Sequence, residues 1–156
     1  MRIKVHFTLK KKQMKVNIKR LIPAAQMPVY ATPGAACFDV CTTDTNSILA
    51  GDSAVFHTGL SFEIPEGHVM KVFSRSGHGF KQGLRLSNGT GIIDSDYRGE
   101  LMVKLHNDGV KTAHIAAGER IAQGMIVPVE QAEFVFADSL SDTERGTGGF
   151  GSTGTV

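Results

Sequence analysis

The chain has 156 residues, of which 41% are hydrophobic and 21% are charged, so it has room for one domain of ordinary size and is too short for a (β/α)₈ barrel. No apolar run reaches the roughly 18 residues of a membrane helix, and the N-terminus lacks the apolar stretch of a signal peptide, so we expect a cytoplasmic protein without a membrane partner. The net charge is only +2, but the charges are unevenly distributed.

The basic residues are concentrated at the N-terminus. Residues 1–38 contain eight of the 17 Lys and Arg and none of the 15 Asp and Glu. Such a segment can hold polyanions through contacts that weaken with salt, and the alternative is a solvated extension. We treat residues 1–13 as a basic N-terminal extension ahead of a second plausible start at Met14. Residues 1–20 are the candidate surface for a weak polyanion contact.

Short apolar runs recur along the rest of the chain. They cover residues 3–9, 54–57, 60–64, 69–73, 101–105, 124–129 and 133–137. Turn-forming residues, such as Pro-Glu-Gly and Asn-Asp-Gly, separate many of them at spacings near ten residues, which is typical of an all-β sandwich or barrel. One short helix is predicted around residues 76–82. The Gly-rich end of the chain predicts a mobile tail.

Cysteine and histidine give little support for a protein-held metal. Cys37 and Cys41 are too few for a disulfide framework, and no third Cys or nearby His completes a zinc site. We therefore expect free thiols that are buried or half-buried. Mg²⁺ carried on substrate phosphates stays open, because this ion needs few protein ligands.

Glycine marks the two windows with the most chemistry. Of the 18 glycines, six lie in residues 77–99 and five in residues 146–154. Glycine is placed where the backbone turns at positive φ or approaches a ligand closely. These windows are therefore the first candidates for a binding site.

Residues 88–100 read Asn-Gly-Thr-Gly-Ile-Ile-Asp-Ser-Asp-Tyr-Arg-Gly-Glu. Glycines on both sides of paired carboxylates indicate a hairpin whose exposed backbone groups can pair with the edge of a base. On a strand, Asp94 and Asp96 would share a face and could act together. At a turn they need not, and a polar turn with solvated carboxylates is the alternative.

Two further segments suit phosphate groups. Arg75 stands between two serines at the predicted start of the helix, where a guanidinium and free N–H groups bind phosphate, although an ordinary helix start with an incidental Arg is the alternative. The tail, residues 145–154, lacks the Lys of a P-loop, but Arg145, Ser152 and Thr153 suit phosphates and Phe150 suits stacking on a base. Its alternative is a tail without a ligand.

Five segments in this order resemble the five motifs of the homotrimeric dUTPase family. They are residues 34–40, 74–77, 88–99, 118–123 and 145–154. The resemblance covers about residues 15–154. Two positions depart from the family pattern: Ser74 stands where Pro is frequent, and Gly124 stands where an apolar residue is usual.

The resemblance implies an all-β subunit, a jelly roll or distorted β-barrel with one short helix, that assembles into a homotrimer. Residues 14–140 would form the barrel domain, and residues 141–156 a tail that closes on the active site of a neighbouring subunit. In the family, each site takes motifs one, two and four from one chain, motif three from a second and the tail from a third.

The implied reaction is hydrolysis of dUTP to dUMP and pyrophosphate by in-line attack of water on the α-phosphate, which limits uracil in DNA and supplies dUMP for dTTP synthesis. Asp94 would orient and deprotonate the water. Mg²⁺ would arrive on the substrate triphosphate, and Asp39 would contact it indirectly, through water, or would organise the site. The alternative for Asp39 is a carboxylate that caps a turn.

The resemblance also assigns residues to the parts of dUTP. Phosphates would be held by Arg75, Ser76, Gly77, Gln123, Arg145, Ser152 and Thr153; uracil would be read by Asn88, Gly91, Ile92 and Ile93 and stacked by Phe150. Tyr97 would lie against the deoxyribose and exclude a 2′-hydroxyl, and Met102 would touch the substrate through its backbone. Asp96, Arg98 and Glu100 are expected to be structural and ion-paired near the subunit interface.

Two alternatives stay open at this point. A dCTP deaminase-related enzyme would share the fold, but the complete tail motif argues against it. A regulatory or binding protein that keeps the dUTPase fold is the other, and the basic N-terminal segment motivates it.

Overall fold

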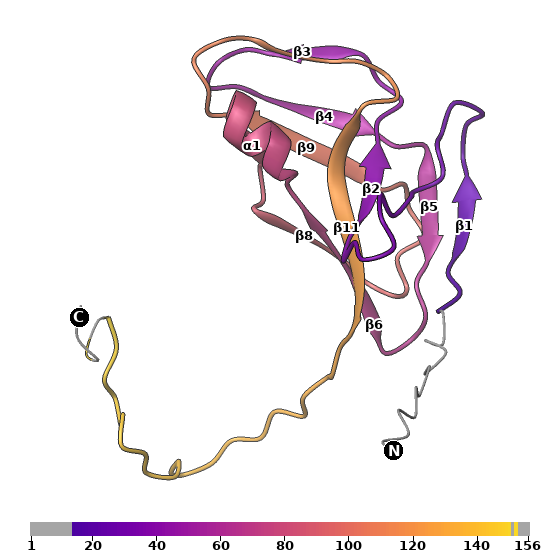
Figure 1. Ribbon diagram of the computed structural model, residues 1–156. Helices are drawn as coiled ribbons and strands as arrows, with labels where there is room; N and C mark the ends of the chain where they lie inside the picture. Colours follow the sequence, from indigo (N-terminus) through magenta and orange to yellow (C-terminus); the bar gives the residue numbers. More distant parts are fainter. Residues whose placement is uncertain (1–13, 151, 153–156) are drawn as a thin grey trace, which may run out of the picture.

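The computed structural model describes residues 14–150 and residue 152. In this part of the chain there are eleven strands and one helix (Figure 1): β1 (Asn17–Arg20), β2 (Phe38–Cys41), β3 (Asn46–Ile48), β4 (Ser53–His57), β5 (Leu60–Glu63), β6 (His68–Phe73), α1 (Ser76–Gln82), β7 (Leu84–Leu86), β8 (Thr90–Ile93), β9 (Met102–Asn107), β10 (Ala113–Ile115) and β11 (Arg120–Pro128). The prediction of an all-β subunit with one short helix is confirmed, and α1 has the predicted bounds.

The strands form antiparallel sheets that pack into a jelly-roll-like body. The largest sheet has the order β2-β11-β6-β8, and a second has the order β4-β9-β7. Strand β1 pairs with β5, and β3 pairs with β10. Within the described residues these sheets do not join into a closed barrel, so the structure is the jelly-roll form of the prediction.

The core lies between the sheets because burial alternates along the strands. In β9, Val103 and Leu105 are buried while Met102 and Lys104 are exposed. The same sheet contributes Phe56 to the core, and the facing sheet contributes Met70; both are fully buried. The outward side chains of β9 are thus available to a ligand.

Gly124 departs from the family pattern for a reason that the packing shows. It pairs with Phe38 of β2, and a Cβ at this position would overlap the Phe38 ring. That ring stacks on Phe62 with 6.5 Å between the centroids. Phe38 therefore occupies the space that an apolar side chain at position 124 would need.

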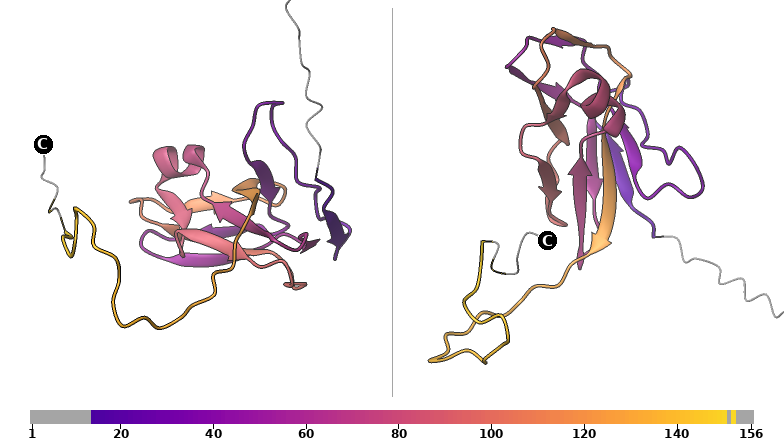
Figure 2. Two further views of the ribbon diagram at one scale, coloured as in Figure 1. Left: turned by 90° about the horizontal axis from the view of Figure 1, so that it is seen from below. Right: turned by 60° about the vertical axis from the view of Figure 1, so that its left-hand side comes forward.

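The C-terminal part of the chain leaves the body after β11. The strand predicted at residues 133–137 was wrong: this segment pairs with no described strand, and Phe134 and Phe136 are almost fully exposed. β11 ends at Pro128, and the following residues lead away from the sheets in all views (Figure 1 and Figure 2). The domain boundary at residue 140 stays a prediction. The run predicted at residues 3–9 lies outside the described residues. No described helix is long and apolar enough to cross a membrane.

Candidate active site

Three of the five motifs meet at one end of the largest sheet. The pairing registers align Asp39 of β2 with Gln123 of β11, and Gln123 with Phe73 of β6. The chain continues from Phe73 directly to Arg75. The Gln123 side chain donates to the Ser74 carbonyl at 2.9 Å, which links β11 to the segment that carries Arg75.

Asp39 organises this end of the sheet by binding two arginines. Arg75 Nε donates to one carboxylate oxygen at 3.1 Å, and an Arg120 guanidinium nitrogen donates to the other at 3.0 Å. The Asp39 side chain is 12% exposed, so burial and charge-assisted hydrogen bonds fix its position. Two cations around one carboxylate leave an excess of positive charge, which favours an anionic ligand.

The sequence analysis missed Arg120 as a site residue. On a regular strand, Arg120 and Gln123 would point to opposite faces because they are three positions apart, an odd spacing. A bulge between Arg120 and Ala122 shifts the register and leaves two consecutive residues, Ile121 and Ala122, buried. Arg120 therefore reaches the same end of the sheet as Gln123. Its place inside the fourth motif was the only available signal.

The start of α1 is fixed against β11. Arg75 precedes the helix in an extended conformation, and its guanidinium also donates to the Arg120 carbonyl at 2.9 Å. His78, the one buried residue of α1, contacts a Glu119 carboxylate oxygen through Nε2 at 3.0 Å. Ser76 and Gly77 are exposed at the helix start, so they are free to contact a ligand beside Arg75.

A cavity of about 350 Å³ lies between β8 and β9. Its lining includes all of the residues predicted to read the base, and Met102: these are Asn88, Gly91, Ile92, Ile93 and Met102. Gly91 is buried, and a Cβ there would come within 3.1 Å of the Val72 Cβ, so a larger residue would require Val72 to move by a few tenths of an ångström.

Asp94 and Tyr97 lie in the turn after β8. Asp94 is exposed and lines a separate cavity of about 620 Å³ that also contacts Asp96. Within one chain Asp94 is far from Arg75. Ile93 pairs with Met70, so Asp94 lies level with Val69 of β6. Val69 is six residues before Arg75, which separates Asp94 from Arg75 by roughly 20 Å at about 3.3 Å per residue. Asp96, Arg98 and Glu100 form no ion pair within the described single chain, and their pairing near a subunit interface stays a prediction.

The described tail residues do not reach either cavity. Arg145 donates to the Gly148 carbonyl at 2.9 Å, and Ser152 lies in the same small turn. Phe150 is fully exposed and has φ of 47°, a left-handed conformation that is uncommon outside glycine. Thr153 lies outside the described residues. A single chain therefore does not bring Arg145, Phe150 or Ser152 to the rest of the site.

Both cysteines are free and half-buried, as expected. They flank Asp39 at positions i−2 and i+2. Cys41 is the last residue of β2 and shares the face of the strand on which Asp39 lies, and Cys37 directly precedes the strand. Burial, together with the negative charge of Asp39, raises the pKa of the Cys37 and Cys41 thiols. The thiols are therefore neutral at pH 7. They do not offset the positive charge of Arg75 and Arg120, which can attract an anionic ligand.

The donor set suits a cation only through water. No group of three or more metal-binding side chains occurs in the described part of the chain. Both oxygens of Asp39 already accept hydrogen bonds from arginines. This fits Mg²⁺ that arrives with its own phosphate and water ligands.

Comparison with known proteins gives a consistent result. A family model described as dUTPase matches residues 24–154. The deoxyuridine 5′-triphosphate nucleotidohydrolase of Nautilia profundicola is 48% identical over 90% of this chain and 99% of its own length. A structure of the Staphylococcus bacteriophage 80alpha dUTPase with dUpNHpp has a TM-score of 0.85 at 30% identity, covering 91% of this chain and 99% of that one. A mutant dUTPase from phage phi11 of S. aureus has a TM-score of 0.75 at 25% identity, covering 81% and 98%, and is described as revealing the coordination of a structural Mg(II) ion.

Proposed function

The chain belongs to the dUTPase family, and from this premise we propose that it hydrolyses dUTP to dUMP and pyrophosphate in the cytoplasm. The observation that carries the proposal is the cavity between β8 and β9, whose lining combines the four residues expected to read the edge of uracil: Asn88, Gly91, Ile92 and Ile93. The cationic cluster around Asp39 supplies a matching site for the triphosphate. A base site and a triphosphate site are together what a nucleotide hydrolase needs.

The cavity accounts for selection of uracil. Backbone groups of Gly91, Ile92 and Ile93, with the Asn88 amide, pair with the edge of the base. Val72 and Gly91 both line the cavity, and a wall packed against C5 of the base would exclude the extra methyl group of thymine. Cytosine carries a donor where uracil carries an acceptor, so it would leave buried polar groups unpaired, a mismatch that costs much affinity.

Phosphate binding and catalysis use different parts of the chain. Arg75, Ser76, Gly77 and Gln123 hold phosphate oxygens, and Arg120 adds charge beside Arg75. Asp94 accepts a proton from the water that attacks the α-phosphorus in line. In phosphoryl transfer, positioning and charge neutralisation provide most of the rate enhancement. Mg²⁺, carried by the triphosphate, would neutralise charge on the phosphates.

The register of β6 and β8 supports a site shared between subunits. Asp94 and Arg75 lie roughly 20 Å apart along β6 in one chain, so both cannot act on the same phosphorus. A second copy that places its Asp94 against Arg75 removes this separation, and a third can supply Arg145, Phe150, Ser152 and Thr153. We therefore propose a homotrimer with sites at the subunit contacts.

The weak polyanion contact of residues 1–20 stays a prediction. Residues 1–13 lie outside the described part of the chain. Lys15, Lys19 and Arg20 are described and exposed, so this end of β1 is accessible to an anionic surface.

The decisive experiment measures pyrophosphate release from dUTP, dCTP, dTTP and UTP, each with Mg²⁺ and with EDTA. The proposal requires release from dUTP with Mg²⁺, and little from the other nucleotides. Ammonia release from dCTP would instead indicate a deaminase. A folded trimer that binds dUTP without turnover would indicate a binding protein.

A further inference from the structure

We propose that Glu100 positions the Tyr97 ring and thereby contributes to the discrimination between dUTP and UTP. Glu100 fixes the peptide group whose carbonyl accepts a hydrogen bond from the Tyr97 hydroxyl. The inference rests on the proposed function, in which the Tyr97 ring lies against the deoxyribose. The sequence suggested a structural role with an ion pair near the subunit interface for Glu100; within the described chain its carboxylate accepts a backbone N–H instead.

The Tyr97 side chain is folded back over the residues that follow it. The Tyr97 backbone N–H donates to the Asp94 carbonyl at 3.2 Å, and the Tyr97 hydroxyl donates to the Glu100 carbonyl at 3.0 Å. Gly99 permits this fold, since a Cβ there would overlap the Tyr97 ring. Tyr97 remains 42% exposed, so part of the ring is open to a ligand.

The peptide between Glu100 and Leu101 connects Tyr97 to the core. Its carbonyl accepts the Tyr97 hydroxyl, and its N–H donates to the Leu60 carbonyl of β5 at 2.8 Å. These two groups point in opposite directions in a trans peptide, so the peptide bridges the ring and the strand. Thr58 Oγ1 also donates to the Leu101 carbonyl at 2.6 Å. Leu60, Thr58 and Leu101 are all buried.

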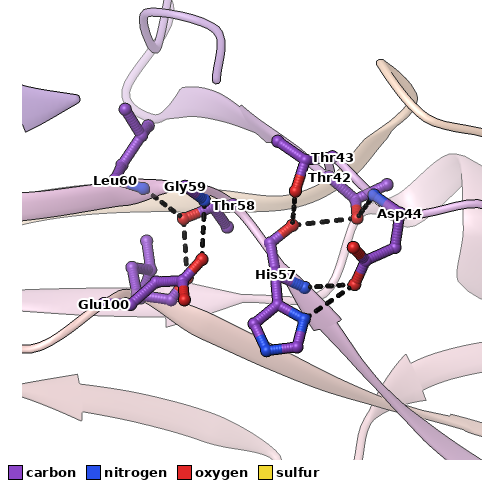
Figure 3. Close-up of polar contacts among 9 residues, drawn as sticks. Thr42, Thr43, Asp44, His57, Thr58, Gly59, Leu60 and Glu100 are labelled. Atoms are coloured by element: carbon purple, nitrogen blue, oxygen red, sulfur yellow. Dashed lines mark hydrogen bonds and ion pairs between the residues drawn. The ribbon is translucent and has the colours of Figure 1, made fainter. Parts of the chain in front are cut away.

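The Glu100 side chain is also fixed, through its carboxylate. One of its oxygens accepts the Gly59 N–H at 2.7 Å (Figure 3). Gly59 has φ of 67°, and a Cβ there would collide with Ile22 and Ala25, so the direction of its N–H is set by a crowded turn. A hydrogen bond to an ionised carboxylate is stronger than one between neutral groups. The Glu100 backbone is therefore held from its own side chain and from β5.

Loss of the contact between Glu100 and Gly59 should affect recognition of the sugar more than recognition of the base. UTP differs from dUTP by one hydroxyl, and a ring that moves by a fraction of an ångström can make room for it. Removing the Gly59 contact frees the Glu100 carbonyl and, through it, the Tyr97 ring. The cavity between β8 and β9 contains neither Glu100 nor Gly59 in its lining, so uracil recognition is expected to persist.

The experiment compares Glu100→Ala with Glu100→Gln, which keeps an acceptor for the Gly59 N–H. The ratio of kcat/KM for dUTP to that for UTP should fall about fivefold in E100A, as expected for one lost hydrogen bond, and stay within about twofold of wild type in E100Q. The preference for dUTP over dTTP and dCTP should not change. An unchanged dUTP-to-UTP ratio in E100A would overturn the proposal.

Tyr97→Phe is the second variant, because it loses the hydroxyl and keeps the ring. It should lower the ratio in the same direction, and E100A/Y97F should lower it no further than the stronger single variant, since both act through one contact. Additive effects would overturn the shared mechanism.

A measurement without turnover separates this inference from the proposed function. The chain has two tyrosines, so ¹³C-labelled tyrosine gives two ring signals, which Tyr30→Phe assigns. In E100A the Tyr97 signal should shift or broaden while that of Tyr30 stays in place, and E100Q should resemble wild type. An unaffected Tyr97 signal would overturn the positioning role. Absence of dUTP turnover in the wild-type protein would overturn the proposed function alone.

Discussion

At the scale of single residues, environment separates side chains that look equivalent in the sequence. Asp94 and Asp96 are both exposed acids of one short turn, and only resemblance to the dUTPase family distinguishes them. Asp39, by contrast, is set apart by its two arginine partners and its burial. Arg120 acquires its importance from the same contact, and it was not predicted.

Replacing Asp94 with Asn should lower kcat for dUTP by about 10³, because an amide cannot accept the proton of the attacking water. Binding of a non-hydrolysable dUTP analogue and the oligomeric state should be preserved, as measured by calorimetry and by gel filtration. Asp96→Asn is the matched control and should remain within about twofold of wild type. Comparable losses in both variants would mean that Asp94 has no special role.

Replacing Arg120 with Ala should raise KM for dUTP about tenfold, because Asp39 loses one of two charge-assisted partners and the phosphate site loses a cation. Arg85→Ala provides the control, since Arg85 pairs with Asp108 at 2.6 Å on the surface. It should leave KM unchanged. Steady-state kinetics with Mg²⁺ test this, and a wild-type KM in R120A would contradict the assignment.

At the scale of elements, long alternating strands were predictable and short ones were not. β6 and β9 have six residues each and show the expected hydrophobic runs. Strands such as β3, β7 and β10 have three residues, too few to show a period, and they form because a partner strand is in place. The opposite error occurred at residues 133–137, where an apolar run has no partner in the described chain.

The last residue of β4, His57, makes a pH-dependent contact with Asp44, which lies between β2 and β3. Asp44 accepts hydrogen bonds from the His57 backbone N–H at 2.7 Å and from the His57 ring at 2.9 Å (Figure 3). The backbone hydrogen bond, followed by the ring contact, lowers the pKa of Asp44 below 3.8. The hydrogen bond to Asp44 raises the pKa of His57 above 6.5.

Wild-type protein should therefore exceed Asp44→Asn in stability most between about pH 4 and pH 6.5, where both groups are charged. The contribution of Asp44 is lost as pH falls through its lowered pKa, and that of His57 is lost as pH rises through its raised pKa. The effect should be small, because the His57 side chain is 51% exposed. Urea midpoints from pH 3 to pH 9 test this, and a difference independent of pH would contradict it.

At the scale of the whole molecule, the site is incomplete in one chain. The antiparallel register separates Asp94 from Arg75, and the described tail residues contact neither cavity. In one copy, the segments expected to act together therefore lie apart. The homotrimer proposed above would give each segment a partner from another subunit.

Complementation between inactive variants tests this arrangement. If Arg75 and Asp94 of different chains form one site, co-refolding equal amounts of Arg75→Ala and Asp94→Asn should restore about a quarter of the wild-type sites by random assembly. Each variant refolded alone should remain inactive. Recovery no greater than in the separate samples would show that both residues act within one chain, and would contradict the shared site.

The sequence by itself determined the all-β class, the single helix and the five family motifs, because these depend on local residue patterns and on resemblance. Tertiary structure alone decided which motifs meet. Strand register aligns Asp39 with Gln123, a bulge turns Arg120 to the same side, and a peptide held by β5 and Glu100 supports Tyr97. These arrangements depend on pairing between segments that are distant in the sequence. A one-residue change of strand register would move the side chains to the other face and separate them, although the local sequence pattern would stay the same.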